Sequence, residues 1–172
     1  TMQGIALHKT PDFNKNIVAD MTSVILSQPL DVSKYSLIYA GAQKNIGPAG
    51  LAVIIIEKNF MNQANTNLSK ILQYREHSKA DSMFNTPPTF AWYVAGKVFK
   101  WIKKSGGLGY FKNANIKKAT LLYEYLDSTD FYINNIQKNQ RSIMNVTFEL
   151  ANEALNKNFI KDSTSKNLLN LK

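Results

Sequence analysis

A single lysine stands among small residues directly after an apolar segment, where its amine could do covalent chemistry. Lys44 follows the segment 35–40 (YSLIYA) and precedes the turn residues Gly47 and Pro48. Small neighbours let a flat ligand approach the backbone, and an amine that loses hydration there becomes available as a nucleophile. A Schiff base with a carbonyl compound is the obvious use of such an amine. The alternative is an ordinary loop lysine that reaches solvent.

An acidic residue, Asp20, ends the short β-branched segment 16–20 (NIVAD), which is predicted to be a strand. An acid at the C-terminal end of a strand in an open α/β sheet faces the crevice where such sheets bind ligands. A buried carboxylate needs a cationic partner, and the protonated ring nitrogen of a pyridine-type cofactor would serve. The alternative is a turn or helix-capping aspartate. Together, Lys44 and Asp20 are the pair of groups that a pyridoxal phosphate enzyme requires.

The elements that position these two residues are predicted to be alternating strands and connections. Strands are expected over 16–20, 35–40 and 51–57. The last of them (LAVIIIE) is continuously apolar, which indicates burial on both faces in the middle of a large sheet. The loop 44–50 contains Gly and Pro, so the strands on its two sides are expected to pair as in a hairpin. Because three strands cannot cover such a strand, the chain is interpreted as a piece of something larger or as an obligate partner in an assembly.

The rest of the chain is predicted to be richer in helices. The expected elements are a helix over 69–78, a helix from Pro87 or Pro88 to about Lys104, a helix over 110–126, a strand over 145–150 and a helix over 151–160. Thr86 can cap the second helix, because a proline in the first turn loses no needed N–H. Gly106 and Gly107 are expected to end it. The shift in composition near residue 105 predicts two domains, 1–104 and 105–172.

The charge of the chain is strongly basic, with 21 Lys and Arg against 12 Asp and Glu and a net charge of +9. Only Arg75 and Arg141 are arginines, and the lysines are scattered, which favours a solvated basic surface. A basic nucleic-acid-binding module is the main alternative. It rests on the net charge and on aromatic residues such as Tyr110 and Phe111 near lysines.

The sequence lacks cysteine, a long apolar run and a signal peptide, and these absences exclude several classes of protein or argue against them. The 172 residues contain no cysteine, so disulfides, thiolate metal sites and cysteine nucleophiles are excluded, and no metal site is predicted. No apolar run is long enough to span a bilayer and residues 1–13 lack a signal-peptide pattern, so a cytoplasmic location is expected. A membrane-surface helix over 90–104 is a further alternative to a helix packed within its domain. His8 and His77 are interpreted as structural or surface residues.

Three segments resemble the phosphoserine aminotransferase family, which belongs to the class V aminotransferases and to fold type I of the pyridoxal phosphate enzymes. These segments are VADMTS (18–23), AGAQKNIGPAG (40–50) and NTPPTF (85–90). The resemblance extends over nearly the whole chain and implies an α/β fold. It places residues 1–104 in the C-terminal part of a large domain, built as a mixed, mostly parallel sheet with helices. Residues 105–172 would then be part of a smaller α+β domain.

The resemblance also implies roles for individual residues. Lys44 matches the lysine that binds pyridoxal 5'-phosphate covalently and moves a proton between the substrate and the cofactor. Asp20 matches the aspartate that pairs with the pyridinium nitrogen, and Gln43 matches a glutamine that hydrogen-bonds the cofactor phosphate. Asn85 and Thr86 match a pair that reaches this phosphate from the neighbouring subunit, which implies a homodimer.

The reaction implied by the resemblance is reversible transamination between glutamate and 3-phosphohydroxypyruvate, a phosphorylated 2-oxo acid. Its products are O-phosphoserine and 2-oxoglutarate, in serine biosynthesis and in many bacteria also in pyridoxine biosynthesis. The family's Gly-rich phosphate turn, the aromatic residue that stacks on the cofactor and the basic residues that bind the substrate have no match in this chain. The chain by itself is therefore expected to be inactive and to bind the cofactor poorly. Neither nucleic acid nor a membrane is a predicted partner under this interpretation.

Overall fold

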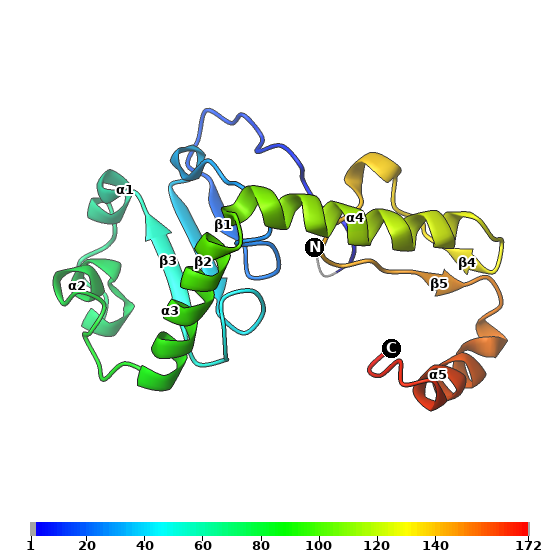
Figure 1. Cartoon of the computed structure of the whole chain (residues 1–172). Coiled ribbons are helices and arrows are strands. Elements are labelled where there is room, and N and C mark those ends of the chain that lie inside the picture. Colours follow the sequence, from blue (N-terminus) through cyan, green and yellow to red (C-terminus); the bar gives the residue numbers. More distant parts are fainter. Residues whose placement is uncertain (1–2, 172) are drawn as a thin grey trace. The chain divides into compact units, whose positions relative to one another are not determined.

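The computed structural model describes residues 3–171 and shows two compact units (Figure 1). The first, here called the sheet unit, comprises His8–Ala114. The second, the terminal unit, combines the N-terminal segment up to Leu7 with the chain from Asn115 onward. The predicted domains 1–104 and 105–172 are divided elsewhere in the sequence and stay a prediction.

Short strands and helices make up both units. The sheet unit contains β1 (Val18–Asp20), β2 (Leu37–Gly41), β3 (Ala52–Ile56), α1 (Lys58–Asn62), α2 (Tyr74–Lys79) and α3 (Thr89–Lys104), with 3-10 turns at Val32–Lys34 and Lys70–Leu72. Helix α4 (Gly107–Asp127) begins in the sheet unit and continues into the terminal unit. The terminal unit contains β4 (Tyr132–Ile133), β5 (Glu149–Leu150) and α5 (Asn156–Ser165), with 3-10 turns at Lys138–Gln140 and Glu153–Leu155.

The three strands of the sheet unit form one mixed sheet in the order β1-β2-β3. Strand β1 is parallel to β2, with Asp20 opposite Tyr39, and β2 is antiparallel to β3. The predicted hairpin-like pairing across the loop 44–50 is therefore confirmed. Because β1 and β2 are parallel, their C-terminal ends lie at the same edge of the sheet, which brings Asp20 and the turn after β2 together.

The core of the sheet unit is built from β2, from the segments that follow β1 and β2, and from α3. Its buried members are Met21, Ile25, Ile38, Ala40, Ala42, Ile46 and Ala95. Helix α3 (Figure 1) contributes Ala95 to this core, and the small side chain of Ala95 allows close approach; Ala91 on the same helix is also buried. This packing supports the interpretation of α3 as a helix packed within its unit rather than a membrane-surface helix.

Strand β3 differs from its prediction. Its apolar run predicts burial on both faces, but β3 stands at the edge of the described sheet and Ile55 is 39% exposed. The physical reason is that β2 is its only neighbouring strand among residues 3–171, and that the face on which Ile55 lies is only partly covered by that part of the chain.

The start of α3 also corrects a prediction. The helix begins at Thr89 with Pro88 as its N-cap, and no side chain caps it, so the proposed cap by Thr86 is wrong. The buried face comprises Ala91, Ala95 and Ile102, whereas the apolar residue Phe90 is 72% exposed. The predicted end is confirmed, because α3 stops at Lys104.

The remaining helices agree with their predictions in outline. The helix over 110–126 is α4, which begins about one turn earlier, and the helix over 69–78 forms as a 3-10 turn followed by α2. The helix over 151–160 is a 3-10 turn followed by α5, which continues to Ser165. The strand over 145–150 shrinks to the two residues of β5, because β4 offers it only two partners.

Candidate functional site

The carboxylate of Asp20 lies at the C-terminal end of β1 and is hydrogen-bonded by Thr22. Its Oδ1 accepts the backbone N–H of Thr22 at 2.9 Å. The hydroxyl and the backbone N–H of Thr22 both stabilise the charged form, and they lower the pKa of Asp20 below its ordinary value of 3.8. Asp20 is exposed, so the structure holds an ionised acid that a cationic ligand can reach.

Lys44 lies in the turn that follows β2. Ala42 and Ile46, two residues to either side, are buried and fix the turn to the core. The N–H of Gly47 closes the turn by donating to the carbonyl of Ala42 at 2.8 Å. Lys44 itself is exposed, and its Nζ donates to Ser23 Oγ at 2.5 Å. The expected loss of hydration at this amine does not occur in the described chain, because Lys44 is exposed, together with Gln43, between the buried residues Ala42 and Ile46.

The amine lies within electrostatic reach of the acid. The positive charge of Lys44 is one of the influences that lower the pKa of Asp20, after the hydrogen bonds with Thr22. Both groups project from the same edge of the sheet, since β1 and β2 are parallel. The site therefore combines an amine and an ionised acid at the C-terminal ends of two neighbouring strands.

The neighbours of Lys44 in the turn are also placed by specific contacts. The side-chain amide of Gln43 lies directly over Gly41, where a Cβ atom would collide with its Oε1. Asn45 donates from Nδ2 to the carbonyl of Ile25 at 2.8 Å, which ties the turn to the segment after β1. Gln43 is exposed at the same edge as Lys44, whereas Asn45 is half-buried.

Asn85 and Thr86 lie in the exposed loop between α2 and α3. Within residues 3–171 no described contact joins them to Asp20 or to Lys44, so the structure brings together Asp20, Gln43 and Lys44 but not this pair. His77 packs against Phe84 with ring centroids 5.2 Å apart, and its Nε2 is 2.8 Å from the carbonyl oxygen of Ile71. This environment agrees with a structural role.

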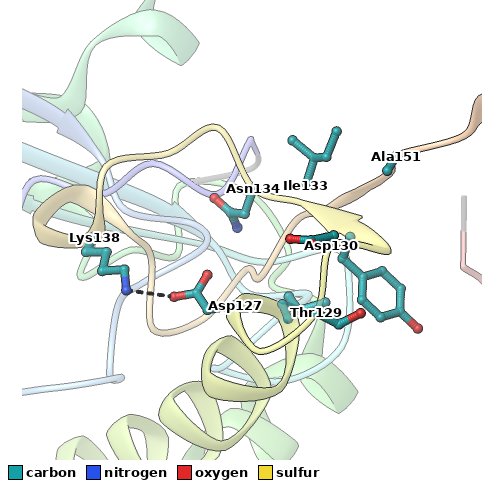
Figure 2. A pocket seen from close by; sticks show the side chains of 9 residues that line it. Asp127, Thr129, Asp130, Ile133, Asn134, Lys138 and Ala151 are labelled. Carbon is teal, nitrogen blue, oxygen red and sulfur yellow. Dashed lines mark ion pairs between the residues drawn. The ribbon is translucent and has the colours of Figure 1, made fainter.

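A separate pocket of about 470 Å³ lies in the terminal unit (Figure 2). Its lining residues are Leu126, Asp127, Thr129, Asp130, Tyr132, Ile133, Asn134, Lys138 and Ala151. Lys138 and Asp127 point toward each other across it, with Nζ and Oδ2 3.1 Å apart. None of the site residues predicted from the sequence lines this pocket, and sequence reasoning did not identify it because its residues, nearly all between 126 and 138, form no recognisable motif.

The guanidinium groups of both arginines form contacts with other residues of the chain. Arg141 Nη1 pairs with Asp127 Oδ2 at 2.8 Å, and Arg75 Nη2 donates to the carbonyl of Asn62 at 3.2 Å. Guanidinium groups that are engaged in this way do not form the fork that a nucleic-acid binder aims at phosphates. This finding counts against the nucleic-acid alternative.

Comparison with known proteins identifies the family. The model of the class-V aminotransferases matches residues 5–165, so the chain belongs to the class-V aminotransferase family. It is 51% identical over 172 residues to a phosphoserine aminotransferase of Idiomarina loihiensis, covering 100% of this chain and 48% of that protein. The chain thus spans about half the length of this curated relative.

Solved structures show the same likeness. The phosphoserine aminotransferase from Bacillus circulans subsp. alkalophilus matches with a TM-score of 0.95 at 40% identity, over 100% of this chain and 48% of that one. The PLP-bound phosphoserine aminotransferase from Trichomonas vaginalis matches with a TM-score of 0.93 at 37% identity, over 100% of this chain and 50% of that one. The α/β fold with small mixed sheets and helices is therefore the fold of these enzymes over about half their length.

Two features are absent from residues 3–171. No helix in this range is long and apolar enough to cross a membrane. No group of three or more His, Asp or Glu side chains in the same range could hold a metal ion.

Proposed function

We propose that this chain forms the lysine-bearing part of a phosphoserine aminotransferase that uses pyridoxal 5'-phosphate. The observation that carries the proposal is the placement of Asp20 and Lys44 at the C-terminal ends of two neighbouring parallel strands, in a chain 51% identical to such an enzyme. The proposed reaction exchanges an amino group between glutamate and 3-phosphohydroxypyruvate. Roles in serine biosynthesis and in pyridoxine biosynthesis, and a cytoplasmic location, belong to the same proposal.

The residues of the chain have distinct tasks in this proposal. When bound, the cofactor supplies an electron sink for the substrate carbon that loses its proton. The Lys44 amine binds the cofactor aldehyde, and once released it moves that proton. The Asp20 carboxylate, already ionised through Thr22, holds the ring nitrogen in its protonated form. Gln43, exposed beside Lys44, donates its amide to the cofactor phosphate.

Asn85 and Thr86 belong to the proposal through the dimer. Their loop is exposed and no described contact joins it to Lys44, which suits residues that serve the site of a neighbouring subunit. We propose a homodimer in which this pair hydrogen-bonds the phosphate held by the partner's Gln43 and the partner's Lys44. In this arrangement residues 1–104 are part of a large cofactor-binding domain and residues 105–172 part of a small domain.

The cofactor itself provides the test. The chain is incubated with pyridoxal phosphate, the adduct is reduced with borohydride, and the modified lysine is located by mass spectrometry. We expect weak binding overall, with the adduct concentrated on Lys44 and abolished there by Lys44→Ala. Lys58→Ala, which removes an exposed lysine outside the turn, is the matched control and should leave the adduct unchanged. Equal modification of many lysines would contradict the proposal.

The nucleic-acid alternative predicts a different result. A basic nucleic-acid-binding module would be retained on heparin with a steep dependence on salt, and it would show no preference for modification at Lys44. Weak retention together with selective modification supports the aminotransferase.

A further inference from the structure

Two consecutive residues with hydroxyl groups, Thr22 and Ser23, hydrogen-bond the acid and the amine of the candidate site. The hydroxyl of Thr22 hydrogen-bonds the carboxylate of Asp20, and the same oxygen accepts the backbone N–H of Gly41 at 3.1 Å. Thr22 thus links the end of β1 to the end of β2. It is half-buried between them, so its hydroxyl is not simply a solvated group.

The next residue performs the corresponding task for the amine. Ser23 Oγ accepts from Lys44 Nζ at 2.5 Å, across 21 positions of sequence. Ser23 is also half-buried, whereas Lys44 is exposed. The hydrogen bond therefore fixes the tip of a long side chain that would otherwise move freely in solvent.

We propose that Thr22 and Ser23 form a hydroxyl clamp, which sets the carboxylate of Asp20 and the amine of Lys44 in fixed positions relative to each other before the cofactor binds. The two are positioning residues: Thr22 acts through Asp20 and Ser23 acts through Lys44. This inference deepens the proposed function and rests on it for its purpose, although the clamp itself is a property of the protein without the cofactor.

A second aspartate in the chain shows why the arrangement is more than a local turn. Asp31 Oδ1 accepts from the backbone N–H of Ser33 at 3.1 Å and from its hydroxyl at 2.6 Å, the same local pattern as Asp20 with Thr22. Asp31 belongs to an exposed 3-10 turn, and no described bond leads from Ser33 to another strand. The bonds that reach Gly41 and Lys44 are what distinguish the clamp from such a turn.

The part of the clamp that holds Asp20, here called the carboxylate arm, is tested by carbon-13 NMR titration of the full chain. Thr22→Val keeps the size and β-branching of threonine but removes the hydroxyl. We expect it to raise the pKa of Asp20 toward 3.8, because the largest stabilising contact of the charged form is lost. Thr22→Ser should restore the parent value, and Asp31 in the same spectrum should not change. An unchanged pKa of Asp20 in Thr22→Val, or a failure of serine to restore it, overturns this arm.

The amine arm is tested by NMR relaxation of the Lys44 side chain, with exposed Lys34 as the internal reference. We expect Lys44 to be more restricted than Lys34 in the parent chain and as mobile as Lys34 in Ser23→Ala. Equal mobility of both lysines in the parent overturns the arm. Thr22→Ser serves as the folding control, since it keeps a hydroxyl at the neighbouring position.

Borohydride trapping then separates the clamp from the function. If the clamp prepares the cofactor site, both Thr22→Val and Ser23→Ala should reduce the share of the adduct found on Lys44 severalfold. Suppose that the NMR experiments give the expected results but that neither the parent nor the variants bind pyridoxal phosphate selectively at Lys44. The proposed function is then wrong, while the hydroxyl clamp is supported. If the parent captures pyridoxal phosphate selectively and neither variant changes this share, the positioning role fails while the function stands.

Discussion

Arg141 and Asp127 form a bidentate ion pair in the terminal unit, with Nη1 2.8 Å from Oδ2 and Nη2 2.9 Å from Oδ1. The same guanidinium donates from Nε to the carbonyl of Ile136 at 3.2 Å, and its Cζ lies 4.8 Å from the centroid of the Tyr123 ring. One side chain thus joins the end of α4 to a loop that follows it in sequence. Parallel forked bonds of this kind are stronger than a single contact between point charges.

We expect this ion pair to make the chain sensitive to acid. Hydrogen bonds from Arg141 and then Lys138 hold the pKa of Asp127 at about 2, below the ordinary 3.8. Because the folded-state pKa is the lower one, the stabilisation is complete above 3.8 and is lost as the pH falls toward about 2. The Asp127 side chain is 29% exposed. Solvent screening therefore limits the contribution to about 1 kcal/mol.

Urea unfolding of the parent and of Asp127→Asn checks this expectation. The variant should be less stable at neutral pH, and the difference between the two should shrink as the pH approaches 2. The pair of exposed Lys79 and half-buried Glu76 is the control, because a helical pair of this kind contributes only about 0.3–0.5 kcal/mol. A difference that stays constant down to low pH would contradict the assignment to Asp127.

The turn that contains Lys44 is stabilised by the side chain of Asn45. We expect Asn45→Ala to lower the free energy of unfolding by about 1 kcal/mol, because it removes the hydrogen bond to the carbonyl of Ile25. Asn59→Ala, at an exposed position in α1, should change it far less. Equal effects of the two variants in urea unfolding would show that the bond to Ile25 does not hold the turn.

The space above Gly41 is reserved for another side chain. We expect Gly41→Ala to displace the amide of Gln43, because the new methyl group would collide with its Oε1. The tip of a glutamine is flexible, so the fold should survive and only the side-chain amide signals of Gln43 should shift in NMR spectra. Unchanged signals would show that Gln43 does not lie over Gly41.

Two glycines in and just after α3 should respond to alanine in opposite ways. Gly96 lies inside the helix, and apart from its chain neighbours and the adjacent helix backbone no atom lies within 4 Å of the position that an added methyl group would take. Gly96→Ala should therefore stabilise the chain by about 0.5–1 kcal/mol. Gly106 has a φ of +103°. Gly106→Ala should destabilise the chain by about 1 kcal/mol, since alanine is strained there. Thermal unfolding of both variants checks the signs, and the same sign for both would refute the argument.

Local patterns predicted the arrangement around Lys44 well. The glycine and proline of the loop 44–50 indicated the pairing of β2 with β3, and the β-branched segment before Asp20 indicated that this acid ends a strand. Both are effects of residues close in sequence. The family resemblance was equally accessible, because it depends on short segments that lie in order along the chain.

Features that depend on distant residues could not be predicted in the same way. The bond from Lys44 to Ser23 and the ion pair of Arg141 with Asp127 join segments whose approach is decided by packing. The exposure of Ile55 depends on which segments pack over the face of β3, which its apolar composition does not reveal. Thr86 does not cap α3 because the helix begins only at Thr89, later than the proline pattern indicates.

Strand β3 has a consequence for how this polypeptide behaves in a concentrated solution. Within residues 3–171, the N–H and C=O groups on the side of β3 away from β2 meet no other strand. An unpaired edge strand can form backbone hydrogen bonds with an extended segment of another chain, and the isoleucine side chains of β3 favour such pairing. Protein made without a strand to occupy this position would therefore tend to precipitate, and its yield in a cell would be governed by chaperones and proteases more than by the strength of its core.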